Sequence, residues 1–221
     1  MSKYKKTTKE TYNTISKDWE TKRKYYWKPI TQFLSSFQNA KKLTMLDLGC
    51  GTGRHLELAK KLGFQNKNTI GADYSSGQLE IVKQKGFQTK LTNLENLDFK
   101  DSSFDIIICI AAHHHLLKIE EQLKSLQEIN RILKPNGQIL LSNWFPEKKF
   151  TKEQEKKGKF EFIDKDKQKV KVTYTYNNEK LNRYYYLFKQ KELENLCKKA
   201  NLKITKQEFN KGNLYLTMIK D

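Results

Sequence analysis

Three glycines alternate with other residues directly after a short apolar run. Gly49, Gly51 and Gly53 close that run, and apolar residues then recur at helical spacing over residues 54–62. This order predicts a strand, a tight turn and a helix. Glycine lets the backbone of such a turn come close to a ligand, and the first helical turn offers it free N–H groups. The G-x-G-x-G spacing, with Asp47 before it, favours a ligand site over a turn that merely requires glycine.

Polar residues also end the next two predicted strands. Asp73 follows the strand 69–72, about 20 residues past the glycines, where an acid can accept hydrogen bonds from both ribose hydroxyls of an adenosine cofactor. The alternative is that Asp73 caps the following helix, and one residue can do both. Asn93 follows the strand 87–91 and can meet the adenine amino group.

Three successive histidines, 113–115, follow the fully apolar run 106–111. Such a run predicts a central parallel strand, and ligands bind at the carboxyl ends of such strands. We expect one functional histidine here, His114 or His115. The alternative is a loop in which one histidine caps a helix and another packs. Adjacent histidines in an extended chain point to opposite faces, and no further His or Cys cluster exists, so no metal site is expected.

Arginine is rare in this chain. Only four of the 43 basic residues are arginines, namely Arg23, Arg54, Arg131 and Arg183. Where lysine is the default cation, a retained arginine is a candidate for planar, bidentate contacts. Arg23 lies beside an aromatic cluster, and interleaved bases and aromatics suit stacking and phosphate contact. The alternative is that these aromatics form the core of an N-terminal helical cap. Trp144 ends the strand 138–143, on the ligand side.

The bulk composition limits the class of protein. A chain of 221 residues can bury one α/β core, and a net charge of +18 favours a polyanionic partner, nucleic acid or an anionic membrane face. The alternative is that much of this charge comes from a lysine-rich proteome, which uses lysine wherever any polar residue will do. Three separated cysteines indicate no zinc site or disulfide, which fits a reducing cytosol. No signal peptide is recognisable and the longest apolar run is too short to span a bilayer, so a cytoplasmic location is expected.

The remaining pattern predicts one α/β domain, 1–221, with an N-terminal helical cap over 1–42 and an insertion over 145–182. Within the insertion, 160–163 and 170–176 can pair as a hairpin. A polar turn joins the last two strands, so the final strand is predicted to be antiparallel. The other predicted elements are strands 44–48, 203–209 and 214–219 and helices 7–37, 76–85, 120–133 and 191–200, with a Pro-Asn-Gly turn in 134–137 after the third helix.

This order of elements and motifs resembles the class I S-adenosylmethionine-dependent methyltransferases. Residues 47–53 resemble their cofactor loop, and 104–105 and 131–137 resemble their later motifs. The resemblance covers about Leu43 to Ile219. It implies a Rossmann-like α/β fold with a seven-stranded, mostly parallel sheet, an antiparallel last strand, helices on both faces, and S-adenosylmethionine as cofactor. The expected cofactor-binding residues are Asp47, Gly49, Cys50, Gly51, Gly53, Asp73, Tyr74, Asn93, Leu94 and Ile110.

A narrower resemblance is to the tRNA wobble-uridine carboxymethyl methyltransferases, which include the methyltransferase domain of the human AlkB homologue eight. It rests on Tyr12-Asn13-Thr14-Ile15, on Arg23 with Trp27 and Pro29, on 110–116, on Trp144 and on 183–188. The chain departs from that pattern at Tyr186, where the family has His, at Lys24-Tyr25, and at Asn93, where Asp is common. The first two bear on substrate contacts, while the Asn93 carbonyl can still meet adenine.

The implied reaction is methylation of a carboxylate on the wobble-uridine side chain, which gives a methyl ester. A carboxylate is already nucleophilic at pH 7, so no general base is needed. The protein must align oxygen, methyl and sulfur and exclude water. The residues expected to do this are Arg23, Arg183, His114 or His115 as donors to the carboxylate and Trp144 as a stacking wall.

The same resemblance implies two partners, tRNA and a small zinc-binding activator protein. The strand 87–91 would be a sheet edge open to β-augmentation by such an activator. Two other functions stay open: a small-molecule methyltransferase of the quinone or sterol type, and a non-catalytic RNA-binding module on this fold. Salt-sensitive tRNA binding and cofactor turnover distinguish them.

Overall fold

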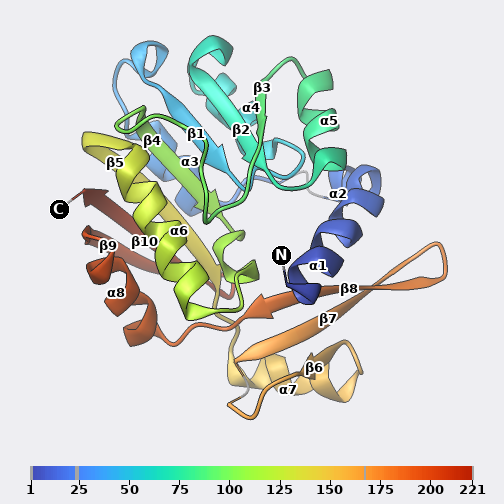
Figure 1. Ribbon diagram of the computed structural model, residues 1–221. Helices are drawn as coiled ribbons and strands as arrows, with labels where there is room; N and C mark the ends of the chain where they lie inside the picture. The colour runs from blue at the N-terminus through green and yellow to red at the C-terminus, as the bar shows by residue number, and fades with distance from the viewer. Residues whose placement is uncertain (1, 23–24, 167, 221) are drawn as a thin grey trace.

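The computed structural model describes residues 2–22, 25–166 and 168–220 (Figure 1). Within these residues, seven strands form one sheet in the order β3-β2-β1-β4-β5-β10-β9. The pairs from β3 to β5 are parallel, and β10 is antiparallel to both neighbours. The strands are β1 Met45–Leu48, β2 Thr69–Asp73, β3 Gln88–Leu91, β4 Phe104–Ile110, β5 Leu133–Trp144, β9 Leu202–Asn210 and β10 Asn213–Lys220. The predicted fold class is confirmed.

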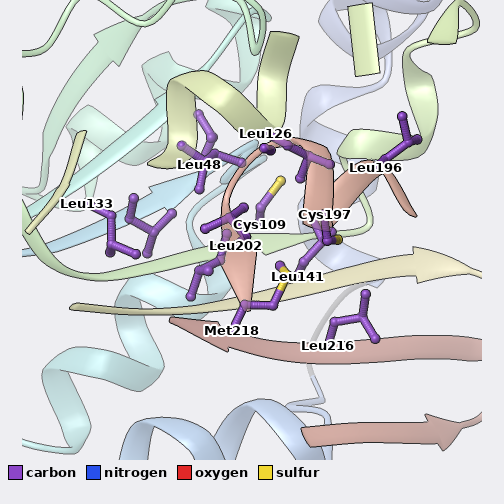
Figure 2. Close-up of a cluster of buried hydrophobic side chains, with 14 of the residues drawn as sticks. Leu48, Cys109, Leu126, Leu133, Leu141, Leu196, Cys197, Leu202, Leu216 and Met218 are labelled. Atoms are coloured by element: carbon purple, nitrogen blue, oxygen red, sulfur yellow. The ribbon is translucent and has the colours of Figure 1, made fainter. Parts of the chain in front are cut away.

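Helices cover both faces of this sheet, because β4 in its centre has apolar side chains on both of its faces. Its Ile106, Ile108 and Ile110 pack with α3 and α4, whereas Ile107 and Cys109 pack with α6 and α8. Figure 2 shows the second of these clusters around Cys109. The helices are α3 Lys28–Ser35, α4 Arg54–Lys61, α5 Ser76–Gln84, α6 Ile119–Ile132 and α8 Gln190–Lys199, with short 3₁₀ turns at Ala40–Lys42 and Asn66–Asn68.

The N-terminal segment is divided where one long helix was expected. It forms α1 Lys3–Thr14, α2 Ser16–Lys22 and α3, in which Pro29 occupies the first turn. Trp27 caps α3 with extended backbone, and proline is tolerated in the first turn because the N–H that it lacks would have no partner within the helix there. Arg23, which was expected to be catalytic, lies outside the described residues.

The segment after β5 forms a second, small sheet rather than a single hairpin. Its elements are α7 Lys148–Lys156, β6 Phe160–Phe162, β7 Lys169–Tyr176 and β8 Glu179–Tyr186, with the strand order β6-β7-β8. The predicted β6–β7 pairing is present, with Phe160 opposite Val172. Arg183 pairs with Val172 inside β8, and the strand is followed by α8, where the helix 191–200 was predicted. Asn177 and Asn178 both have positive φ, as a type I′ hairpin turn requires.

Two further local predictions need correction. Residues 134–137 lie within β5 as an irregular stretch, not as a turn outside the strand: Phe104 is opposite Leu133, but Ile106 is already opposite Gln138. The histidines form a 3₁₀ turn, His113–His115, so their side chains are not arranged as in an extended chain. No helix in the part of the chain that the structure describes is both long and apolar enough to cross a bilayer.

Candidate functional site

A cavity of about 510 Å³ lies at the carboxyl ends of β1, β2, β4 and β5. This volume is within the usual range for small-molecule sites. The turns after these strands form one wall. The N-terminal helices and the small sheet form the other, through side chains that include Tyr12, Trp19, Tyr174, Arg183 and Tyr185. The large sheet alone would leave this space open, so the N-terminal helices and the small sheet make it a cavity.

Two features of the glycine turn require glycine: a positive φ and close contacts with neighbouring side chains. Gly49, Gly51 and Gly53 all have positive φ, between +57° and +83°. A Cβ on Gly49 would lie 2.2 Å from the Ala112 Cβ, and one on Gly51 would lie 2.8 Å from the Gln78 side-chain oxygen. Gly49 and Gly51 line the cavity with Cys50, whereas Gly53 does not; it is the N-cap residue of α4. The turn therefore needs glycine for its own geometry and also places backbone at the cavity surface.

Asp73 lines the cavity beside this turn. Its carboxylate accepts hydrogen bonds from Gly51 N–H (3.0 Å) and Ser75 N–H (2.9 Å). Burial raises the pKa of Asp73, and these backbone donors oppose that rise. Ser75, not Asp73, caps α5, because its hydroxyl accepts from Gln78 N–H. The alternative interpretation of Asp73 as the helix cap was wrong.

Asp47 lies beneath the turn and does not line the cavity. It is fully buried, and neither carboxylate oxygen has a hydrogen-bond partner among the described residues. Burial, together with the negative charge of Asp73, raises the pKa of Asp47 to about 8. His55 Nδ1 lies 3.9 Å from Asp47 Oδ2. The Asp47 carboxyl is therefore mostly protonated at neutral pH.

The remaining predicted cofactor residues meet at the β2, β3 and β4 ends of the cavity. Tyr74, Asn93, Leu94 and Ile110 all line it. The Tyr74 hydroxyl is buried with no hydrogen-bond partner in the described residues. This end therefore combines apolar walls with a few polar atoms, as sites for a flat base do.

The histidine turn divides its side chains between the core and the cavity. His113 points away: its ring stacks on Phe188 and its Nε2 donates to the Gln122 carbonyl (3.2 Å). His114 and His115 both line the cavity. Sequence reasoning expected one functional histidine and could not choose; the structure brings both to the same wall.

Both cavity histidines are uncharged near neutral pH. Trp144 N–H donates to His114 Nδ1 (2.9 Å). His115 Nδ1 donates to the Tyr184 carbonyl (2.7 Å), which leaves Nε2 to accept from the Tyr12 hydroxyl (3.1 Å). Burial lowers the pKa of His115 to about 4 and that of His114 well below its ordinary value. These rings therefore offer hydrogen bonds rather than positive charge.

Arg183 is a buried cation of the cavity, and unlike the buried Lys5, which pairs with Glu95, it has no carboxylate partner in the described residues. It is 7% exposed, and its guanidinium lies 4.9 Å from the Trp19 ring centroid and 5.2 Å from that of Tyr174. The rings of Tyr12 and Tyr185 complete this cage at 5.8 Å each. No carboxylate in the described parts of the chain forms an ion pair with Arg183, and its Nε is buried without a hydrogen-bond partner. An anion from a ligand would satisfy both deficits.

Trp144 joins the two sheets at the cavity wall. Its ring packs edge-on against Phe160 (5.1 Å) and Tyr185 (5.3 Å), which come from the small sheet. The β5 end therefore fixes the small sheet, and through it the strand that carries Arg183.

The other two described arginines differ in their surroundings. Arg54 lines the cavity near the glycine turn, stacks over Trp27 (4.8 Å) and donates to the Tyr25 carbonyl. Sequence rarity had singled out Arg54, but it was not assigned to the site. Arg131 lies away from the cavity and forms a bidentate pair with Glu128.

Tyr186 replaces a histidine of the resembling family, and it does not line the cavity. Its hydroxyl donates to Glu192 on α8 (2.7 Å). Sequence reasoning did not assign Tyr12, Trp19, Tyr174 and Tyr185 to the site, although Tyr12 and Tyr185 lie in segments that carry the narrower resemblance. Their grouping around Arg183 could not be predicted, because they come from three separate segments.

These features fit an adenosine cofactor with an amino-acid tail. Gly49 and Gly51 bring backbone to the cavity surface, Asp73 lines it with a carboxylate that could accept from ribose hydroxyls, and the buried Tyr74 hydroxyl lacks a partner in the described residues. S-adenosylmethionine, when bound, supplies a methyl group activated by a sulfonium.

Comparison with known proteins defines the class. Residues 46–141 match a family model described as a methyltransferase domain. A Clostridium acetobutylicum S-adenosylmethionine-dependent methyltransferase superposes with a TM-score of 0.67 at 16% identity, over 94% of this chain and 98% of that one. Residues 46–141 therefore match a methyltransferase domain, and the chain shares the fold of S-adenosylmethionine-dependent methyltransferases.

More particular similarities concern tRNA. A Mus musculus protein named "Probable tRNA methyltransferase 9B" is 33% identical over 124 residues, 56% of this chain and 26% of that protein. The Arabidopsis thaliana tRNA (carboxymethyluridine(34)-5-O)-methyltransferase is 30% identical over 66% of this chain and 35% of its own length. The chain thus spans about a quarter to a third of these relatives.

A solved complex of the Haloferax volcanii Trm112 methyltransferase activator with a methyltransferase is also similar. It matches with a TM-score of 0.68 at 14% identity, over 96% of this chain and 97% of that one. At this identity the match supports the shared fold alone.

Proposed function

We propose that this chain methylates a carboxylate carried by the wobble uridine of tRNA, a 5-carboxymethyl group, and forms its methyl ester. The observation that carries the proposal is the caged, uncompensated charge of Arg183 in the same cavity as the glycine turn. A buried guanidinium without a counter-ion is unfavourable unless a ligand supplies one. A carboxylate matches the planar donor geometry of arginine.

The neutral histidines suit this chemistry. A carboxylate needs no general base, so neither histidine has to take up a proton. His114 and His115 are held uncharged by burial. We assign His114 the task of orienting the carboxylate while Arg183 holds its charge, because His114 Nδ1 accepts from Trp144 N–H and its Nε2 therefore carries the proton. Both nitrogens of His115 are already engaged, so His115 positions Tyr12 instead. Trp144 forms the wall against which the base can stack. Arg23 stays a predicted contact that the described residues do not include.

Three observations favour RNA over a small substrate. The net charge of +18 attracts a polyanion. The named relatives are tRNA methyltransferases, one of them for carboxymethyluridine. The N-terminal helices and the small sheet, which carry the cage, are also where the resemblance to the wobble-uridine enzymes lies outside the cofactor motifs.

An activator protein is the proposed second partner. The activator in the similar solved complex motivates it. The strand β3 lies at the edge of the large sheet, where its outer hydrogen-bonding groups can add a strand from another chain. Leu91, at the end of β3, is 56% exposed and offers an apolar contact.

The test is methyl transfer from labelled cofactor into tRNA that bears the carboxymethyl wobble group, with and without a candidate activator. We expect label that mild alkali releases, because an ester hydrolyses whereas a base or ribose methyl does not. The matched control is the same tRNA without the carboxymethyl group, which should take up no label. Alkali-stable label would exclude the carboxylate chemistry. Cofactor binding with no transfer to any tRNA would favour a small-molecule substrate.

A further inference from the structure

Helices α1 and α2 connect the two walls of the cavity. Figure 1 shows them running between α5 and β8. The α5 helix begins directly after the Asp73 turn, and β8 carries Arg183. The two helices also line the cavity themselves, through Lys5, Tyr12 and Trp19. They therefore contact both the cofactor end and the proposed carboxylate end.

On the β8 side, α1 occupies the free edge of the small sheet. The Thr8 hydroxyl accepts from Tyr184 N–H (3.1 Å), and the Thr11 hydroxyl donates to the Asn182 carbonyl (2.8 Å). These two partners flank Arg183 in the strand. Both threonines are buried, so their hydroxyls replace the backbone partners that an edge strand lacks. The position of α1 thereby sets the position of the Arg183 backbone.

On the α5 side, α1 is fixed by Asn13. Its side-chain oxygen accepts from the Ser75 hydroxyl (2.7 Å) and from Gly77 N–H (3.1 Å). A backbone N–H can only donate, so the amide oxygen must face it. A Cβ on Gly77 would lie 3.0 Å from the Asn13 carbonyl oxygen and 3.2 Å from its Cα. The absence of that Cβ lets the two segments touch.

These contacts join into one path. Gly51 N–H and Ser75 N–H hold the Asp73 carboxylate, and Ser75 also donates to Asn13. The neighbour of Asn13, Tyr12, bonds to His115 (3.1 Å). Asn13, Ser75 and Gly77 are absent from the cavity lining, so this path can be changed without removing a ligand contact.

We propose that Asn13 is a positioning residue that couples the cofactor end of the cavity to the Arg183 end. A ligand at Asp73 fixes the turn before α5, and the hydrogen bonds of Asn13 then hold α1 in place. The position of α1 in turn fixes Tyr12 and β8 where they can bind the carboxylate. Coupling of this kind is reciprocal: each ligand tightens the binding of the other by the same factor. The identity of the second ligand rests on the proposed function.

Three substitutions and one control test the contact between Asn13 and the start of α5. Asn13→Ala removes the acceptor, whereas Asn13→Asp keeps an oxygen for both donors and adds a charge that suits the start of α5. Gly77→Ala disturbs the same contact from the other side. Thr14→Ala is the matched control, because the Thr14 hydroxyl donates to Glu10 within α1 (3.0 Å).

The first measurement is the affinity for an anticodon stem-loop with carboxymethyluridine, with and without S-adenosylhomocysteine, which has no methyl to transfer. We expect this cofactor product to tighten RNA binding by about tenfold in the wild type. The factor should fall below about twofold in Asn13→Ala and Gly77→Ala, and persist in Asn13→Asp and Thr14→Ala. A wild-type factor near one, or an unchanged factor in folded Asn13→Ala, overturns the proposal. If Asn13→Ala does not fold, the contrast between Gly77→Ala and Asn13→Asp decides.

The second measurement needs no RNA. Hydrogen exchange of residues 181–186 should slow when S-adenosylhomocysteine alone binds the wild type or Asn13→Asp, and not when it binds Asn13→Ala. If this protection is found but the wild type binds no modified RNA, the proposed function fails and the positioning role stands. If the wild type methylates the RNA but protection and coupling are the same in Asn13→Ala, the positioning role fails alone.

Discussion

Arg183 and Arg131 show what the same residue type does in two settings. Arg131 meets Glu128 and Asp101 at the surface, so its charge is compensated within the protein. Arg183 is surrounded by aromatic rings and has no such carboxylate among the described residues. Aromatic faces attract a cation without accepting its hydrogen bonds as an oxygen does. Arg183 Nε is buried without a hydrogen-bond partner in the described residues, which makes Arg183 a candidate for binding an anionic ligand.

Arg183→Ala should lower kcat/KM for carboxymethyl tRNA by about 100-fold, because removing one partner of a buried charge pair costs about 2–5 kcal/mol. Arg183→Lys should recover part of the loss, since it keeps the charge but not the planar fork. Methyl-transfer kinetics measure both. The control is Lys180→Ala, which removes the same charge from an exposed position of β8 and should change the rate less than about twofold. Equal losses in Arg183→Ala and Lys180→Ala would refute the assignment.

The buried histidines make stability depend on pH. Burial lowers the pKa of His113 to about 4 in the folded chain, against about 6.5 when unfolded. Between these values the unfolded chain binds the extra proton, so this stabilisation is present above pH 6.5 and is lost as pH falls toward 4. The wild type should lose about 2 kcal/mol more than His113→Gln between pH 7 and pH 5, measured by urea unfolding. A difference independent of pH would show that His113 titrates normally.

At the scale of elements, the glycine turn packs directly against Ala112, which follows β4. At position 49 the backbone φ is +74°, which would strain any residue other than glycine. Ala112 also occupies the space that a side chain at this position would need. Gly63 shares the positive φ, but nothing lies within 4 Å of its missing Cβ. A substitution at Gly63 would therefore cause backbone strain alone, whereas one at Gly49 would cause both backbone strain and a steric clash.

Gly49→Ala should weaken S-adenosylhomocysteine binding by more than about tenfold, because the new methyl displaces the turn from Ala112. Gly63→Ala carries only the backbone strain of about 1 kcal/mol and should bind the cofactor product normally. Calorimetric titration of both variants makes the comparison. Adding Ala112→Gly to Gly49→Ala should recover part of the affinity. Normal binding by Gly49→Ala alone would show that the turn tolerates the displacement.

The edge strand β3 carries the proposed activator contact. Leu91→Lys should weaken capture of a candidate activator by about tenfold or more, because a central apolar contact typically contributes over 1 kcal/mol. Ile119→Lys is matched in type and is 47% exposed at the start of α6, away from β3. It should leave capture unchanged. Equal loss in both variants, measured by co-purification and titration, would place the interface elsewhere.

At the scale of the whole molecule, charge should control RNA affinity. With a net charge of +18, tRNA binding should fall steeply with salt, by about 10³-fold between 50 and 200 mM if about six phosphates are contacted. Binding of S-adenosylhomocysteine should change little over the same range. Filter binding at several salt concentrations gives the slope. A flat slope would favour the small-molecule alternative and a charge that merely reflects lysine usage.

The sequence by itself determined the fold class and predicted residues of the glycine turn and Asp73, which line the cavity. The glycine turn, Asp73 and the apolar run before the histidines are local patterns, because strand, turn and helix geometry depend on residues close together in the chain. The polar turn between the last two strands predicted an antiparallel last strand, and the family resemblance implied seven strands; the strand pairing confirms both.

Only the tertiary structure decided the rest. The cage around Arg183 combines side chains from α1, α2, β7 and β8, and the contact of Asn13 with the start of α5 joins segments 62 and 64 residues apart. It also placed Arg183 in a strand, brought both His114 and His115 to one wall, and turned Tyr186 away from the cavity. Such contacts leave no periodic trace, because their partners are chosen by packing between distant elements and not by neighbours in the sequence.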